Sequence, residues 1–170
     1  MKNLVVISLF LFGCNYHSFA QVHKHTLGVR TTGLDPFRNM SIAYQLGLGK
    51  ADRLDFSLNA NGALSKNYSQ LGGTGSIYYN HVWNIKGGFN WYVGVGINYS
   101  AQHINPIDGP QTFNNVLSFG PQIGLEYDFN VLNVPLLLSI DLRPSIMYNF
   151  NGGFNYNPAN RAGISLRYTF

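Results

Sequence analysis

The sequence has few charged residues, a single cysteine and no long apolar run. Charged residues make up 11% of its 170 residues, well below the ~25% typical of soluble domains. The one cysteine, Cys14, has no partner in the chain, which excludes a disulfide framework. No apolar run reaches the ~20 residues that a spanning helix needs, which excludes a helical membrane protein. Basic residues are scattered and the net charge is only +4, so nucleic acid is not an expected partner.

The N-terminus has the pattern of a secretory leader. Lys2 supplies a positive charge, an apolar run follows it, and small residues precede a predicted cleavage point after Ala20. We therefore expect a signal peptide over 1–20 and one mature domain over 21–170. An alternative is a lipoprotein leader, because the residues that end at Cys14 resemble a lipobox.

The rest of the chain alternates between apolar and polar residues. In the stretch from 117 to 129, the odd-numbered residues are apolar and the even-numbered ones are Ser, Gly, Gln, Glu or Asp. This period of two is typical of strands with two different faces, and no stretch has a helical stripe. The pattern predicts eight strands, at 24–33, 40–49, 53–65, 75–85, 89–102, 116–129, 135–150 and 161–170.

The predicted connections alternate between short and long. Short turns follow the second, fourth and sixth strands, and longer polar loops lie near 34–39, 66–74, 103–115 and 151–160. Small membrane barrels show this asymmetry, with short periplasmic turns and longer outer loops. We expect the last three of these loops to be the contact surfaces of the protein.

Side-chain volume decides which face of the sheet points inward. The interior of an eight-stranded barrel is only just wide enough to be filled by side chains. The face rich in Gly, Ser and Asn fits this space, and the face rich in Leu, Phe, Trp and Tyr does not. An outward apolar belt needs lipid around it, so the all-β fold predicted here is an eight-stranded antiparallel up-and-down transmembrane barrel. Because a leader precedes it, we expect it in the outer membrane of a Gram-negative bacterium, with both termini periplasmic.

The aromatic residues support this orientation. Two girdles of amphipathic rings are expected at the two membrane interfaces. The turn-side girdle would hold Trp83, Phe89, Trp91, Tyr127, Phe129, Tyr168 and Phe170. The loop-side girdle would hold Tyr99, Phe119, Tyr148 and Phe150.

The last strand resembles the insertion signal of bacterial outer-membrane barrels, in which a polar residue, a glycine and two spaced hydrophobic residues precede a terminal aromatic. Here these roles fall to Arg161, Gly163, Leu166, Tyr168 and Phe170. By strand pattern and end signal, the mature chain resembles the small eight-stranded barrels of the OmpX and OmpA type. The resemblance implies outer-membrane lipid and the barrel assembly machinery as partners, but a shared barrel does not imply a shared function.

Charged residues of both signs fall on the predicted inward face. These are Arg30, Asp55, Glu126, Asp128, Asp141, Arg143 and Arg167. Charges in a narrow lumen are costly unless they are paired. We therefore expect a salt-bridge and hydrogen-bond network that fills the barrel, with a narrow conducting pore as the alternative.

Catalytic and metal-binding alternatives have weaker support. Lipid A deacylase barrels use a His-x-Ser pair, which the mature chain lacks. Palmitoyl-transfer barrels place His, Asp and Ser near the outer surface, and Ser100, His103 and Asp108 could form such a trio. His23 and His25 share a predicted strand face, but two ligands do not make a metal site, and we predict no metal or cofactor.

Two prolines interrupt the predicted strands. If Phe129 pairs with Leu136, then Pro121 stands opposite Pro144. Because proline cannot donate a hydrogen bond to the ladder, the pair predicts a bulge or a weak point in the wall. Similar interruptions serve as lateral lipid gates in palmitoyl-transfer barrels, and that is the alternative interpretation here.

Taken together, these features predict a non-catalytic structural or interaction protein of the outer membrane. Alternatives are an accessory subunit of a larger outer-membrane complex, a lipid A-modifying enzyme and a narrow pore.

Overall fold

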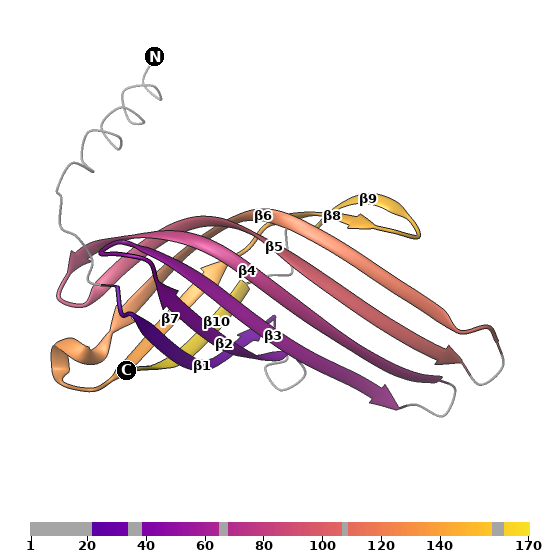
Figure 1. Ribbon diagram of the computed structural model, residues 1–170, viewed down its shortest axis with the longest axis horizontal. Helices are drawn as coiled ribbons and strands as arrows, with labels where there is room; N and C mark the ends of the chain where they lie inside the picture. The colour runs from indigo at the N-terminus through magenta and orange to yellow at the C-terminus, as the bar shows by residue number, and fades with distance from the viewer. Residues whose placement is uncertain (1–21, 34–38, 65–67, 107–108, 158–161) are drawn as a thin grey trace, which may run out of the picture.

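The structure is a computed structural model that describes residues 22–33, 39–64, 68–106, 109–157 and 162–170. In these ranges, ten strands and one short 3₁₀ helix follow one another (Figure 1). They are β1 (His25–Thr32), β2 (Met40–Gly47), β3 (Asp52–Leu64), β4 (Tyr68–Lys86), β5 (Phe89–Pro106), β6 (Thr112–Asp128), η1 (Phe129–Leu132), β7 (Leu136–Leu142), β8 (Ser145–Asn149), β9 (Gly153–Asn157) and β10 (Ala162–Thr169). Among the described residues, no helix is long and apolar enough to cross a membrane. The predicted leader, with Cys14, lies outside them.

The strands form one closed antiparallel barrel. Each strand from β1 to β6 pairs with the next, β7 pairs with β10, and β10 returns to β1, where Val29 lies opposite Leu166. β8 continues the line of β7 along β6, and β9 pairs with β8 on the side where β10 pairs with β7. The ten segments therefore form the eight strands of the barrel wall. The predicted eight-stranded antiparallel barrel is confirmed.

The wall of the barrel is much taller on one side than on the other. In Figure 1, β3 to β6 run far past the ends of β1, β2, β7 and β10. β4 has 19 residues and β1 has 8, which at ~3.3 Å per residue gives lengths of about 60 and 26 Å. Since a barrel's apolar band is about 25 Å tall, the long strands exceed a membrane even when tilted.

This extension corrects two predicted loops. The region 66–74 does not form one long loop, because β4 already begins at Tyr68 and pairs with both neighbouring strands from Ser69 onward. The predicted loop 103–115 shortens in the same way, since β5 continues to Pro106 and β6 begins at Thr112. The predicted loop 151–160 contains strand β9 in its described part.

The seventh predicted strand divides into β7 and β8 at Arg143 and Pro144. On both sides of the break the pairing with β6 keeps one register, with Ile123 opposite Leu142 and Phe119 opposite Ile146. The register predicted for this strand pair is therefore confirmed. The proline pair falls at the place where the ladder to β6 is interrupted.

The outer surface of the barrel is apolar and the interior is polar. Most of the large exposed side chains are Leu, Ile, Val, Phe or Tyr, whereas most buried residues are polar or charged. Aromatic rings gather at both ends of the belt. At the turn end Trp83 stacks on Trp91 with ring centroids 4.4 Å apart, and at the loop end Tyr148 packs 5.3 Å from Phe150. A surface of this kind is stable only against an apolar medium.

Candidate functional site

The loop-side half of the lumen contains one carboxylate held between two guanidinium groups. Asp141, on β7, accepts hydrogen bonds from Nε of Arg30 at 3.1 Å and from its Nη2 at 2.6 Å. Nε of Arg143 lies 3.1 Å from the same carboxylate. All three side chains are almost fully buried. We call these residues the upper cluster, and it has two positive charges against one negative charge.

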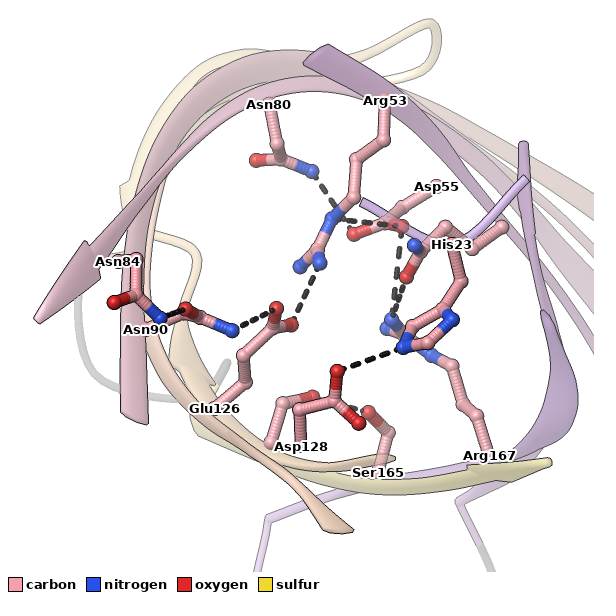
Figure 2. Close-up of polar contacts among 12 residues, drawn as sticks. His23, Arg53, Asp55, Asn80, Asn84, Asn90, Glu126, Asp128, Ser165 and Arg167 are labelled. Carbon is pink, nitrogen blue, oxygen red and sulfur yellow. Dashed lines mark hydrogen bonds and ion pairs between the residues drawn. The ribbon is translucent and has the colours of Figure 1, made fainter. Parts of the chain in front are cut away.

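The turn-side half contains a second, balanced set, which we call the lower cluster (Figure 2). Arg53 bonds Glu126 at 2.6 Å and lies 3.4 Å from Asp55. Arg167 approaches Asp55 to 3.6 Å and donates to Gln45 at 2.9 Å. Two positive charges face two negative ones, so the lower cluster is close to neutral.

Sequence analysis missed Arg53, which is the member of the lower cluster with the least exposed surface. Its exposed fraction is 0%. It lies two residues before Asp55 and therefore on the same face of β3, a parity that could have identified it.

Two buried tyrosines fill the space between the charged side chains. The Arg53 guanidinium lies 4.4 Å above the ring of Tyr92, and that of Arg143 lies 4.3 Å above the ring of Tyr78. Both contacts have cation–π geometry, which is more stabilising away from water. The buried rings and ion pairs together fill the middle of the lumen.

Inward-facing glycines make room for these large side chains. A Cβ atom at Gly96 would lie 2.5 Å from Cγ of Tyr78, and one at Gly163 would lie 2.2 Å from Nη2 of Arg30. Any larger residue at these positions would therefore displace a ring or a guanidinium group. The glycine-rich inward face thus makes room for the filled lumen.

At the turn end, a smaller polar group lies across the mouth of the barrel. Nε2 of His23 lies 2.7 Å from the Asp128 carboxylate, which also accepts hydrogen bonds from the backbone and side chain of Asn130. Asn130 in turn donates to Thr169 at 3.0 Å.

The predicted histidine pair does not share a face. His23 points into the barrel mouth, whereas Nδ1 of His25 lies 2.8 Å from the Tyr44 hydroxyl and its ring stacks against Phe170 at 5.9 Å. The expectation that both histidines lie on one strand face is therefore wrong, because His23 precedes β1. No group of three or more metal-ligating side chains occurs in the described part of the chain.

The loop end of the lumen opens into a cavity lined largely by Ser, Thr and Asn residues, which we call the vestibule. Its volume is about 930 Å³. Its back wall is the inner face of the long strands, with Asn59, Thr74 and Ser100, and its floor includes Arg30 and Arg143. Among the described residues that line it there is no Asp or Glu.

The structure does not assemble the predicted acyl-transfer trio. Ser100 faces the vestibule and bonds Thr74 at 2.8 Å. His103 lies an odd number of residues further along β5 and packs on the outer face against Phe113, with centroids 4.2 Å apart. Asp108 lies outside the described residues. The geometry therefore does not supply a base beside the Ser100 hydroxyl.

The residues of the predicted insertion signal lie along β10. Gly163 is buried against the lumen, whereas Leu166, Tyr168 and Phe170 are exposed on the outer face. Arg161 lies outside the described residues.

No protein-family model and no curated protein matches the chain. Among solved structures, the N-terminal β-barrel domain of Pseudomonas aeruginosa OprF is similar, with a TM-score of 0.59 and 16% identity over 86% of this chain and 95% of that one. Ail, the attachment invasion locus protein of Yersinia pestis, has a TM-score of 0.51 and 11% identity over 86% of this chain and 96% of its own. At these identities the likeness shows the fold alone. The chain thus has the fold of the small eight-stranded outer-membrane barrels, as its sequence pattern indicated.

Proposed function

We propose that this chain is a non-catalytic protein of the Gram-negative outer membrane, with its lumen closed by charged side chains and its long strands projecting outward. The observation that carries the proposal is the contrast between the two faces of the barrel. Ion pairs and buried tyrosines fill the interior, while exposed Leu, Ile, Val and aromatic residues surround the outside. Such an arrangement is stable in lipid and unfavourable in water.

The projecting part of the sheet supports an interaction role. The ends of β3 to β6 run past the other strands of the wall on the loop side (Figure 1). Large apolar side chains such as Leu71 and Phe113 are exposed there, at 71% and 63%. Exposed apolar residues above the lipid belt are typical of contact surfaces.

We propose that the short turns and both termini face the periplasm and that the loop end faces the medium. The mature chain would have no cysteine, so single-cysteine variants can report this topology. Gln111→Cys places a thiol at the exposed loop end, and Lys86→Cys places one at an exposed turn. On intact cells, a membrane-impermeant maleimide should label the first variant and should label the second only after lysis.

Either of two results would contradict the proposal. One is the reverse labelling pattern, and the other is a chain that fractionates away from outer-membrane markers.

Purification from solubilised outer membranes separates a lone protein from an accessory subunit, since a subunit would co-migrate with a larger barrel.

A further inference from the structure

We infer that the vestibule binds a small, hydroxyl-rich acid, such as a sugar acid, with its carboxylate on Arg30 and Arg143. This inference goes beyond the proposed function and does not depend on which membrane the barrel spans.

The first argument is a local excess of positive charge. Asp141 is the single carboxylate bonded to both guanidinium groups of the upper cluster, and it is itself buried beneath them. The carboxylates of the lower cluster are already paired with Arg53 and Arg167. Among the residues that the structure describes, one positive charge therefore remains uncompensated at the vestibule floor, and an anion is the ligand that balances it.

The second argument concerns donors that point toward the cavity. Nη1 of Arg30 donates to the hydroxyl of Thr32 at 3.2 Å, and Nη1 of Arg143 donates to the hydroxyl of Ser76 at 3.4 Å. Both hydroxyls line the vestibule. These are long bonds to neutral acceptors, whereas a carboxylate forms shorter and stronger charge-assisted bonds with guanidinium groups. A bound acid would therefore gain by replacing the two hydroxyls as the acceptor.

The third argument is the chemistry of the walls. Serine, threonine and asparagine side chains dominate the lining, and no aromatic residue contributes to it among the described residues. Each of these side chains can both donate and accept hydrogen bonds. A ligand that carries several hydroxyl groups can therefore form hydrogen bonds with many of the side chains that line the cavity. A simple inorganic anion would leave those wall groups unused.

The test uses the full mature protein folded in detergent micelles at low ionic strength, with D-glucuronate as the probe. D-glucose is the neutral analogue, and inorganic sulfate is an anion without carbon-bound hydroxyls. By isothermal calorimetry, glucuronate should bind saturably and at least about tenfold more tightly than either comparator, and added salt should weaken its binding. Absence of saturable glucuronate binding would overturn the inference, as would equal binding of glucose or sulfate.

Substitutions at Thr74 test whether glucuronate binds in the vestibule. Thr74→Asp adds a negative charge to the vestibule wall and should weaken glucuronate binding by about 10- to 30-fold. Thr74→Asn, whose side chain has the same shape as Asp but no charge, should change the binding little. Thr112→Asp, at the exposed start of β6 and outside the lining, is the matched charge control. If Thr74→Asp does not fold, Ser100→Asp tests the same wall. Unchanged binding in a folded vestibule variant, or equal loss in the control, would contradict the assignment.

Discussion

Removing the carboxylate of Asp141 should destabilise the barrel more than removing either arginine that it binds. In Asp141→Asn, Arg30 and Arg143 would remain buried next to each other without their shared counter-ion. Three charge-assisted contacts, at 2.6, 3.1 and 3.1 Å, would be weakened or lost at once. Breaking a buried pair by removing one partner costs about 3–5 kcal/mol, and we expect this range for Asp141→Asn.

The matched variant Arg143→Gln should cost less, at about 1–2 kcal/mol. It removes one contact to Asp141 and the stacking on Tyr78, but it leaves a neutral Arg30–Asp141 pair. For the same reason, adding Arg143→Gln to Asp141→Asn should cost less than the sum of the two single changes.

Equilibrium unfolding in urea, from detergent micelles or lipid vesicles, measures these differences. The control is Asp52→Asn, which breaks an exposed contact between Asp52 and His81 at 2.7 Å. Surface pairs of this kind contribute about 0–1 kcal/mol. Equal costs for Asp141→Asn and Arg143→Gln would refute the argument that the upper cluster has excess positive charge.

Three further predictions concern other parts of the wall. Replacing Pro121 and Pro144 with Val and Thr should restore ladder donors and raise the midpoint of urea unfolding; a lower midpoint would show that the break is required by the fold. Asp128→Asn would replace the carboxylate that accepts hydrogen bonds from the backbone and side chain of Asn130 and lies 2.7 Å from His23. It should therefore lower the midpoint of urea unfolding, and an unchanged midpoint would contradict the assignment. Gly163→Ala should cost about 1–3 kcal/mol because its Cβ would meet a buried guanidinium group, whereas the outward Gly75→Ala should be nearly neutral. Equal unfolding midpoints for the two glycine variants would count against the packing argument.

Alternation in the sequence was enough to predict eight strands and the inward face of the charged lumen residues, although not every strand boundary. Parity placed Asp55, Glu126 and Asp141 on the inward face, and they are buried there. Alternation could not identify which side chains pair across the lumen, because these contacts depend on how all eight strands are staggered along the barrel axis. The division into a neutral lower cluster and a positive upper cluster therefore required the structure.

The projecting sheet could not be predicted for a different reason. Residues 71–75 contain three glycines and look like a turn in the sequence. Their strand conformation comes from long neighbours on both sides, where Gly73 pairs with Ala60 on β3 and with Ala101 on β5. Tertiary pairing here overrides the weak strand propensity of glycine.

The central claim is that the middle of the lumen is closed by its own side chains. Single-channel recording of the purified protein in planar lipid bilayers tests it most directly. We predict no steady conductance above the bare bilayer, because the guanidinium groups and the rings of Tyr78 and Tyr92 fill the lumen below the vestibule. Stable openings of uniform size, reproduced with independent preparations, would contradict a closed lumen.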